Sequence, residues 1–397
     1  MPGPGNQWIG KEELAELMDV MESGYLFRYG SLEDPNFKHK VYTFEQEFAA
    51  HCGARYALAT SSGSGALVAA LKAIGIGPGD EVIVPAYTFI ATFSSIIFAG
   101  GVPVLAEIDR SLDIDPTDIE HRITERTRAI MPVHMLGNPC DMDAILEIAG
   151  RHGLAVIEDA CQANGGSYRG RKLGTIGQIG AFSLNIYKTV TAGDGGMVVT
   201  DDADLYNLAF GFHDQGHSPL RSGVEVGKRS VLGMNFRMNE LTGAVALAQL
   251  RKLDRIVATL HERKKRFKDL VAGAGAGGFQ FRILNDPDGE CATLCSVLFD
   301  DPAKAARVAG KLGTTTVDRS GWHVYANMEH FNRYLREKGF PYGKGAFPQT
   351  DDILSRAINL SVGVVDAGLG AAFGIDIDAS DEAIVRAAEK FREACSA

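Results

Sequence analysis

The sequence predicts an α/β protein whose core is a mostly parallel sheet with helices on both faces. From residue 54 onward, short runs rich in β-branched residues alternate with segments in which apolar residues recur at helical spacing. This alternation is typical of βαβ units, in which a helix connects two parallel strands. The strand-like runs are apolar at nearly every position, which indicates strands buried on both faces of the sheet.

The expected elements follow one another in a regular order. Strand-like runs are predicted at residues 55–60, 80–87, 102–108, 126–135 and 154–160. Helical patterns lie between them at residues 65–75, 92–100 and 143–153.

The C-terminal part of the chain predicts a second, smaller domain. Residues 236–272 carry apolar residues at helical spacing and predict a long helix or a helix pair that leaves the sheet domain. Residues 279–397 mix short strands with helices, as an α+β domain does. We therefore place the large domain at residues 1–255, and the linking helix with the small domain at residues 256–397. The "GAGAGG" stretch at 273–278 is interpreted as a glycine-rich connection, because no strand pattern precedes it as a dinucleotide loop requires.

Composition and charge restrict the class of protein. The 397 residues include 45% hydrophobic and 23% charged residues, as in packed globular proteins. The formal net charge of -10 argues against a general affinity for nucleic acid, which needs a basic surface. The sequence shows no membrane-spanning run and no secretory signal pattern, so we expect a cytoplasmic protein with small-molecule partners and no membrane association. Six cysteines at irregular spacing indicate buried free thiols.

Polar stretches follow four of the apolar runs. They are "SSGSG" at 61–65, "AYTF" at 86–89, "EDACQ" at 158–162 and "SLNIYK" at 183–188. Open parallel sheets bind ligands at the carboxyl ends of their strands, so we expect these stretches to converge on one crevice.

The residue types in these stretches describe one kind of cofactor site. The serines and glycines at 61–65 precede a helix, where free N–H groups favour a phosphate, although an ordinary serine N-cap explains the same pattern. Asp159 ends a buried strand and is a candidate to hold a protonated ring nitrogen, and Gln162 follows three positions later. Lys188 lies in a polar turn between two apolar runs, where desolvation makes an amine a usable nucleophile. A phosphate pocket, an acid for a pyridine nitrogen and a lysine for an aldehyde together predict a pyridoxal 5'-phosphate site.

Three longer segments resemble the DegT/StrS family of sugar aminotransferases. The segments begin with "SSGSGALVAALKAIG" at residue 61, "VIEDACQANGG" at residue 156 and "GMNFRMNELTG" at residue 233. The resemblance covers nearly the whole chain and is densest from residue 40 to residue 255. It implies the fold type I architecture of pyridoxal phosphate enzymes, with a large, mostly parallel seven-stranded sheet domain and a smaller C-terminal α+β domain.

The resemblance implies a role for each matching position around the cofactor ring. Lys188 attaches covalently to the cofactor aldehyde, Asp159 pairs with the pyridinium nitrogen, and Gln162 contacts the ring hydroxyl. Phe89 stacks on the ring. Lys188 and Asp159 are therefore the expected catalytic residues.

Four further positions match residues that bind the cofactor phosphate. Ser64, Gly65 and Ser183 match positions within the same subunit. Asn235 matches a position that reaches the phosphate of the opposite subunit. The resemblance thus implies a homodimer with two shared active sites.

The implied reaction is transamination in two half-reactions. An amino donor, L-glutamate or L-glutamine by resemblance, leaves its nitrogen on the cofactor. The nitrogen then passes to a keto or aldehyde carbon of a sugar (nucleotide-linked, phosphorylated or eight-carbon) or of a cyclitol. Antibiotic or polysaccharide biosynthesis is the implied setting.

Two positions depart from the family pattern. Asp194 stands in "GDGG" where the family commonly has "GEGG", and Gln215 stands in "HDQGH" where many members have histidine. His213 and His217 lie four residues apart, but no third ligand accompanies them and we expect no metal. The loop they belong to is expected to line the acceptor pocket.

The acceptor site is the least specified part of the sequence. Its candidate residues are Tyr87, Gln215, His217, Trp322, His323 and Tyr325. Aromatic core packing explains Trp322, His323 and Tyr325 individually at least as well. The segment "SGWHVYANMEHFNRY" at 320–334, with "MESGYLFRYG" and "DDILSRAINLSV", looks closer to family members that act on eight-carbon sugars.

The sequence disfavours two alternative functions relative to the aminotransferase. A sugar dehydratase of the same fold is disfavoured, because such members have histidine at the position of Lys188. A pyridoxal phosphate-binding regulator without turnover is disfavoured by the combination of Lys188, Asp159, Gln162, Ser183 and Asn235, since binding alone needs no electron-sink acid together with a mobile base.

Overall fold

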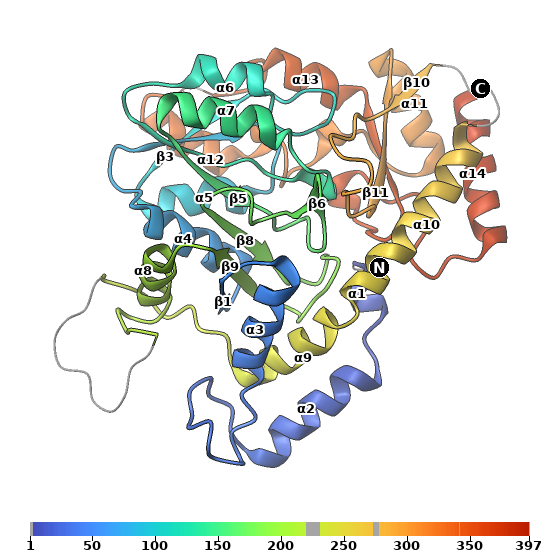
Figure 1. Cartoon of the computed structure of the whole chain (residues 1–397). Helices are drawn as coiled ribbons and strands as arrows, with labels where there is room; N and C mark the ends of the chain where they lie inside the picture. The colour runs from blue at the N-terminus through green and yellow to red at the C-terminus, as the bar shows by residue number, and fades with distance from the viewer. Residues whose placement is uncertain (1–2, 220–230, 273–277, 341, 397) are drawn as a thin grey trace.

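The computed structural model describes residues 3–219, 231–272, 278–340 and 342–396. Its centre is a seven-stranded sheet in the order β1-β9-β8-β5-β4-β2-β3 (Figure 1). Strand β9 is antiparallel to both of its neighbours, and the other strands are parallel to one another. The strands are β1 (Tyr56–Thr60), β2 (Glu81–Pro85), β3 (Val102–Ala106), β4 (Thr127–Ile130), β5 (Ala155–Asp159), β8 (Ile179–Ser183) and β9 (Gly196–Thr200). The predicted mostly parallel seven-stranded sheet is thereby confirmed.

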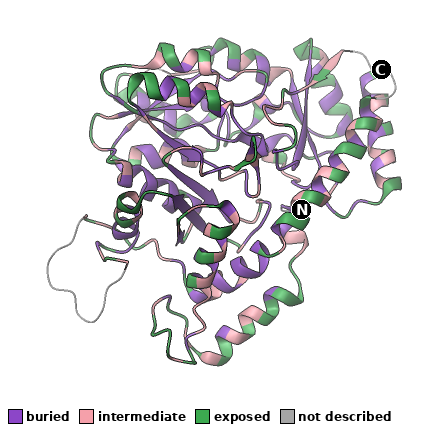
Figure 2. Ribbon diagram, viewed as in Figure 1, coloured by how far each residue is buried: buried purple, intermediate pink, exposed green. Residues whose placement is uncertain are grey.

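Helices cover both faces of this sheet, and each face has its own hydrophobic core. One face is covered by α3 (Lys40–Cys52), α6 (Pro116–Arg122) and α7 (Met142–His152), whose apolar residues share one core with the sheet. The opposite face is covered by α4 (Gly63–Ile74), α5 (Ile90–Ala99) and α8 (Ala203–His213), which belong to a second core. Figure 2 shows the strands between them as almost entirely buried. Burial on both faces explains why the strand-like runs are apolar throughout.

Capping residues fix where the helices begin next to the strand ends. At the start of α4, Ser62 Oγ accepts a hydrogen bond from the Gly65 N–H at 3.0 Å. At the start of α7, Asp141 accepts one from the Ala144 N–H at 3.3 Å. Each cap satisfies an N–H group that the first helical turn leaves without a partner. The turn between β1 and α4 is therefore short, and the N-terminus of α4 lies at the edge of the sheet.

The strand run predicted at 126–135 ends earlier than expected. Strand β4 stops at Ile130, and the chain continues through Pro132 into a 3-10 turn, η1 (Met135–Gly137). Pro132 has no N–H to donate to a neighbouring strand, which explains the early end. Leu136 in the turn adopts a left-handed conformation with φ of 58°.

The region predicted as a long helix or a helix pair is a pair, α9 (Glu240–Leu250) and α10 (Leu253–Ala272). Beyond it lies a three-stranded antiparallel sheet of β10 (Phe279–Phe281), β11 (Leu294–Phe299) and β12 (Ala357–Ser361). Helices α11 (Pro302–Leu312) and α14 (Asp381–Ser396) pack with it. The boundary placed at residues 255 and 256 falls within α10 and stays a prediction. Of the "GAGAGG" stretch, residues 273–277 lie outside the described residues.

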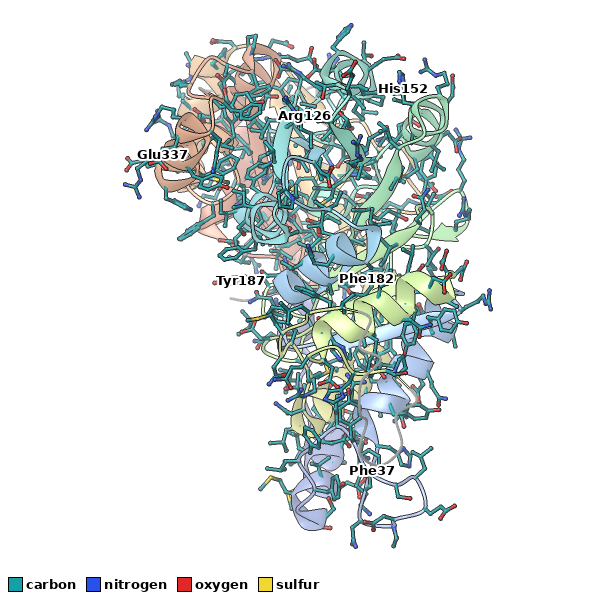
Figure 3. The ribbon with its side chains drawn as sticks, turned by 90° about the vertical axis from the view of Figure 1, so that its left-hand side faces the viewer. Phe37, Arg126, His152, Phe182, Tyr187 and Glu337 are labelled. Atoms are coloured by element: carbon teal, nitrogen blue, oxygen red, sulfur yellow. The ribbon has the colours of Figure 1, made fainter. Side chains whose placement is uncertain are left out.

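The remaining elements are short or peripheral. They are α1 (Pro4–Gln7), α2 (Lys11–Ser23), α12 (Glu329–Glu337), α13 (Pro348–Ser355), the hairpin β6 (Ser167–Tyr168) and β7 (Arg171–Lys172), and the 3-10 turns η2 (Val317–Arg319), η3 (Tyr325–Asn327) and η4 (Ala367–Leu369). Helix α2 packs against α9 in the lower part of the molecule, where Figure 3 also places Phe37. Among the described helices, none has the length and apolar character needed to cross a membrane.

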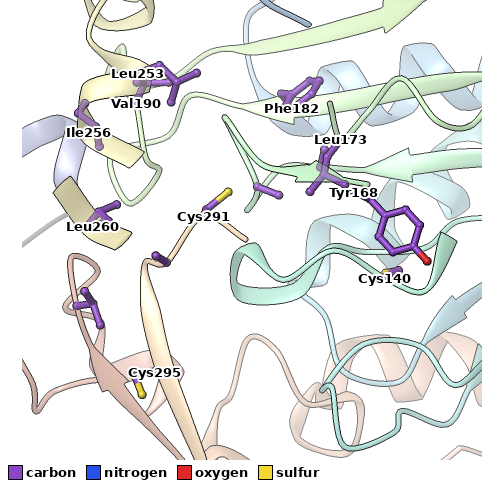
Figure 4. Close-up of a cluster of buried hydrophobic side chains, with 14 of the residues drawn as sticks. Cys140, Tyr168, Leu173, Phe182, Val190, Leu253, Ile256, Leu260, Cys291 and Cys295 are labelled. Atoms are coloured by element: carbon purple, nitrogen blue, oxygen red, sulfur yellow. The ribbon is translucent and has the colours of Figure 1, made fainter. Parts of the chain in front are cut away.

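The cysteines are free thiols, as the sequence predicts. Cys52, Cys140, Cys291, Cys295 and Cys395 are buried. Figure 4 shows three of them among apolar side chains of the first core. Burial raises the pKa of the Cys291 thiol to about 12, so it stays protonated and unreactive. The sixth cysteine, Cys161, is half-buried and lines the cavity described next.

Candidate active site

A cavity of about 530 Å³ lies at the carboxyl ends of the sheet strands. All four predicted polar stretches contribute to its wall. The contributing residues are Ser62, Gly63 and Ser64; Thr88 and Phe89; Asp159, Cys161 and Gln162; and Ser183, Asn185, Tyr187 and Lys188. The predicted convergence is therefore what the fold produces. The rest of the wall comes from the C-terminal half of the chain, including Trp322, His323 and Asp366.

The N-terminus of α4 forms one end of the cavity. Ser62 caps the helix, and Gly63 and Ser64 line the cavity beside Ser183. A Cβ atom on Gly63 would lie 2.6 Å from the Cβ of Ser183, so only glycine fits there. Gly65 is buried and gives its N–H to the Ser62 cap, and it does not line the cavity. The structure shows the serine N-cap, and Gly63 and Ser64 beside it line the cavity at this helix end.

Asp159 is the buried acid of the cavity. It ends β5 and is 3% exposed. Its Oδ2 accepts a hydrogen bond from Thr92 Oγ1 at 2.7 Å, and its Oδ1 accepts one from the Cys161 N–H at 3.1 Å. Thr88 Oγ1 lies 2.7 Å from Thr92 Oγ1 and extends this chain of hydroxyl groups. The two hydrogen bonds fix the carboxylate in one orientation.

Gln162 and Phe89 flank the position of the acid. Gln162 Oε1 accepts a hydrogen bond from the Leu136 N–H at 3.1 Å. The NH2 group of the same side chain can still donate to another acceptor. Leu136, which donates the hydrogen bond to Gln162, is the residue of η1 with the left-handed backbone. Phe89 precedes α5 and is 40% exposed, and its ring centroid lies 5.3 Å from that of His323.

Lys188 lies in the loop between β8 and β9 and is half-buried. Its backbone N–H donates to the Asn185 carbonyl at 2.9 Å. Burial lowers the pKa of Lys188, and the nearby Cys161, Asp159 and Asp366 act in the opposite direction. The loop closes against the sheet because Gly196 passes directly over the Ser62 backbone, where a Cβ would clash. A lysine with a lowered pKa beside a fixed carboxylate is typical of a catalytic pair.

Of the acceptor candidates, Trp322 and His323 line the cavity and the others do not. Tyr87 and Tyr325 are completely buried in the second core, and Tyr325 Oη donates to Asp351 at 3.1 Å. These two tyrosines are core residues in the structure, because the strand end and the turn that carry them direct them into the protein. We therefore do not carry them forward as acceptor contacts.

Gln215, His217 and Asn235 lie outside the cavity wall of this chain. Asn235 is exposed on a segment that pairs with Asp214, and Gln215 Oε1 accepts a hydrogen bond from Arg237 at 3.2 Å. His213 is buried and its pKa is lowered to about 3, first by burial and then by Arg28. Within the described ranges, no group of three or more metal-binding side chains occurs.

Sequence reasoning missed three residues of the site: Thr92, Leu136 and Asp366. Thr92 lies in the first turn of α5, three residues after Phe89. Its closeness to the "AYTF" stretch could have marked it as a site residue from the sequence. Leu136 lies in the turn after β4, and Asp366 lies in the loop after β12. No local sequence pattern marks either of them.

A profile of the DegT/DnrJ/EryC1/StrS aminotransferase family matches residues 7–365. GDP-perosamine synthase of Caulobacter vibrioides is 45% identical over 55% of this chain and 58% of its own length. Spore coat polysaccharide biosynthesis protein SpsC of Bacillus subtilis is 37% identical over 89% of this chain and 90% of its own. A putative L-glutamine:3-amino-2,3-dideoxy-scyllo-inosose aminotransferase of Micromonospora echinospora is 39% identical over 72% of this chain and 66% of its own.

Two solved structures share the fold of this chain over nearly its whole length. 3-amino-5-hydroxybenzoic acid synthase superposes with a TM-score of 0.81 at 28% identity, covering 98% of this chain and 97% of the other. NtdA from Bacillus subtilis, solved with the bound cofactor PMP, superposes with a TM-score of 0.79 at 25% identity, covering 98% of this chain and 84% of the other.

Proposed function

This chain belongs to the DegT/DnrJ/EryC1/StrS aminotransferase family, and we propose that it uses pyridoxal 5'-phosphate to move an amino group from L-glutamate or L-glutamine to a sugar or cyclitol. The observation that carries this proposal is the placement of Asp159 and Lys188 in one cavity whose far end is the N-terminus of α4. Asp159 could hold a pyridine nitrogen, Lys188 an aldehyde, and the N-terminus of α4 a phosphate.

The residues present fit the cofactor. Glycine at position 63 lets the first turn of α4 lie directly against Ser183, because a Cβ there would be 2.6 Å from the Ser183 Cβ. A phosphate at this end of the cavity could accept hydrogen bonds from the first N–H groups of α4 and from the Ser64 and Ser183 hydroxyls. Asp159 is fixed by two hydrogen bonds and can accept one from a protonated ring nitrogen. Gln162 and Phe89 line the same cavity, where Gln162 could contact the ring hydroxyl and Phe89 could stack on the ring.

The chemistry divides between the cofactor and the protein. When bound, the cofactor supplies an electron sink that makes the Cα proton of an amino donor removable. Asp159 keeps the ring nitrogen protonated, because the ionised carboxylate favours a positive charge beside it. In the resting enzyme Lys188 would hold the cofactor aldehyde until the amine of the donor displaces it. Burial favours the neutral amine of the released Lys188, which could then take the Cα proton of the donor and deliver it to C4' of the cofactor.

The proposed assembly is a homodimer with shared sites. Asn235 cannot contribute to the cavity of its own chain, since it lies outside the wall and is exposed. Neighbouring residues on the same segment are also exposed, with Leu232 at 97% and Met234 at 59%. Exposed apolar residues around a functional polar side chain are typical of a protein interface. A second copy that covers this segment would receive Asn235 at its own phosphate site.

The class of acceptor is inferred from the names of the similar proteins. Their names describe a GDP-linked sugar, a coat polysaccharide and an amino-substituted inosose. We propose a nucleotide-linked, phosphorylated or eight-carbon sugar, or a cyclitol, as the acceptor, within antibiotic or polysaccharide biosynthesis in the cytoplasm. The presence of Lys188 continues to disfavour the dehydratase, and its joint placement with Asp159 disfavours a silent regulator.

A visible spectrum of the purified protein loaded with pyridoxal 5'-phosphate tests the proposal. Addition of L-glutamate or L-glutamine should abolish the visible band and produce the spectrum of the pyridoxamine form, and the effective donor is thereby identified. A keto sugar or keto cyclitol should restore the band. A protein that binds the cofactor but responds to neither donor would contradict the proposed donors, and one unable to bind it would contradict the proposed function.

A further inference from the structure

One wall of the cavity comes from the C-terminal part of the chain. Asp366, Gly368 and Leu369 line the cavity together with Trp322 and His323. Asp366, Gly368 and Leu369 belong to the loop that follows β12 and contains η4. We call Trp322, His323, Asp366 and Gly368 the C-terminal wall.

The loop presents Asp366 in a fixed position. Asp366 Oδ1 accepts a hydrogen bond from the Gly368 N–H at 2.7 Å, and the Asp366 carbonyl accepts one from the Ala371 N–H at 2.9 Å. Asn359, in strand β12, donates from Nδ2 to the Leu369 carbonyl at 2.8 Å. The carboxylate is thus held in place by the small sheet, so a ligand does not have to order it.

Trp322 supplies an aromatic surface in the same wall. Its side chain is 57% exposed although the residue lines the cavity. The backbone of this segment is tied to the start of α5, because the Ile90 N–H donates to the Trp322 carbonyl and the Thr88 N–H donates to the His323 carbonyl, both at 2.9 Å. An exposed indole on a fixed backbone offers a flat apolar face for the C–H groups of a saturated ring.

The charges of the wall restrict what it can bind. Among the described residues that line the cavity, the carboxylates are Asp159, Asp194 and Asp366, and the one cationic side chain is Lys188. His323 is neutral near pH 7, because burial, and then Lys188, lower its pKa to about 3. A carboxylate accepts hydrogen bonds from hydroxyl and ammonium groups and repels a phosphate.

We propose that the C-terminal wall binds the acceptor ring, with Trp322 against its apolar face and Asp366 accepting hydrogen bonds from hydroxyl or amino groups of that ring. The acceptor would then be a hydroxylated or amino-substituted six-membered ring with no anionic group on the carbons that meet Asp366. A phosphate or nucleotide, if present, is directed away from this wall. This inference rests on the proposed aminotransferase function and specifies its substrate class.

The two half-reactions separate the inference from the function on which it rests. The donor half-reaction is followed as loss of the visible band with L-glutamate or L-glutamine. The acceptor half-reaction is followed as return of the band after addition of scyllo-inosose, 3-amino-2,3-dideoxy-scyllo-inosose or a nucleoside-diphosphate 4-keto sugar. Asp366→Asn keeps the side-chain oxygen that caps η4 and removes the charge. Asp301→Asn is the matched control, because Asp301 caps α11 in the same way and does not line the cavity.

Asp366→Asn should lower kcat/KM for the reactive ring probe by about tenfold or more, as expected when a hydrogen bond to a charged group is weakened. It should change the donor half-reaction much less, because Asp366 has the smallest effect of the three nearby groups that raise the pKa of Lys188. Asp301→Asn should change neither. Trp322→Ala, at an exposed position, should likewise affect the acceptor step alone.

Three outcomes would overturn the inference. In one, Asp366→Asn changes the acceptor step by less than twofold. In another, it impairs the donor step equally, which would make Asp366 a partner of Lys188. In the third, the wild-type protein completes the donor step but accepts none of the three ring probes. Failure of the wild-type donor step with both donors is a different result, since it would refute the proposed function itself.

Discussion

At the residue scale, the site depends on partners that hold its two central groups. Asp159 is recognisable from the sequence because it ends an apolar run, and Lys188 because it interrupts one. Two hydrogen bonds orient Asp159. One comes from Thr92, which is distant in the sequence, and the other comes from the backbone N–H of Cys161, which no side-chain pattern reveals. Local patterns therefore predict the reactive side chains, whereas tertiary packing determines which groups position them.

The substitution Thr92→Val removes one of the two hydrogen bonds to Asp159 without a large change in side-chain volume. We expect the affinity for pyridoxal 5'-phosphate to fall by about tenfold, because a carboxylate that loses a fixed donor pairs less well with the ring nitrogen. Ser95→Ala is the control, since Ser95 Oγ is buried one turn further along α5 and donates to the Thr92 carbonyl. Cofactor binding measured by fluorescence should distinguish the two, and equal losses would mean that Thr92 acts only through stability.

The pH dependence of cofactor attachment follows from the environment of Lys188. Burial lowers its pKa, so the neutral amine is available at a lower pH than in free lysine, whose pKa is about 10.4. The rate at which the apoprotein forms its visible band should rise with pH and reach half of its maximum below that value. A lysine derivative in solution serves as the reference. A protein profile that coincides with the reference would show that burial does not activate Lys188.

At the element scale, the sequence predicts the sheet strands well and their ends less well. The apolar runs match β1 to β5, because burial on both faces demands such composition. The run at 126–135 ends early at Pro132, and the choice between one long helix and a pair at 236–272 needed the structure. The role of the N-terminal segment at residues 3–7 depends on tertiary contacts that the sequence does not reveal. Gly3 donates its N–H to the Ile186 carbonyl at 2.9 Å, so the N-terminal segment lies directly behind the Lys188 loop.

The substitution Gly5→Val tests whether this N-terminal segment supports the Lys188 loop. A Cβ at Gly5 would lie 2.7 Å from Val190 Cα and 2.8 Å from the Thr189 carbonyl oxygen, so a larger side chain must displace the loop. We expect a loss of stability of about 1–3 kcal/mol, as for other overpacked sites, together with weaker cofactor binding.

Gly343→Val is the control for this prediction, because a Cβ at Gly343 meets no atom within 4 Å. Thermal unfolding of the apoprotein and cofactor titration should be measured for both variants. Unchanged cofactor affinity in Gly5→Val would show that the segment does not position Lys188.

At the scale of the whole molecule, the family and its fold could be predicted from ordered motifs, whereas the shape of the acceptor pocket could not. Each motif specifies a strand end, and the parallel sheet brings the strand ends together. The C-terminal wall instead forms where the segment of Trp322 and His323, which is hydrogen-bonded to the start of α5, and the loop after β12 line the same cavity. Tyr87 and Tyr325 illustrate the limit, since aromatic residues near the expected pocket proved to belong to the core.

Complementation between two inactive variants tests the shared active site. If Lys188 and Asn235 of opposite subunits form one site, a dimer of Lys188→Ala with Asn235→Ala contains one intact site and one doubly altered site. Random pairing in an equal mixture should then restore about a quarter of the wild-type sites. Each variant alone, mixed with itself by the same refolding procedure, is the control. Activity that remains at the average of the two parents would mean that each site lies within one chain.

The attachment point of the cofactor is the most direct test of the whole account. The protein loaded with pyridoxal 5'-phosphate is treated with borohydride, which makes a lysine–cofactor bond permanent, and its peptides are mapped by mass spectrometry. We predict one pyridoxyl group, on the peptide that contains Lys188, and none in the Lys188→Ala variant. Label on a different lysine, or undiminished label in that variant, would contradict the assignment of Lys188 and the mechanism built on it.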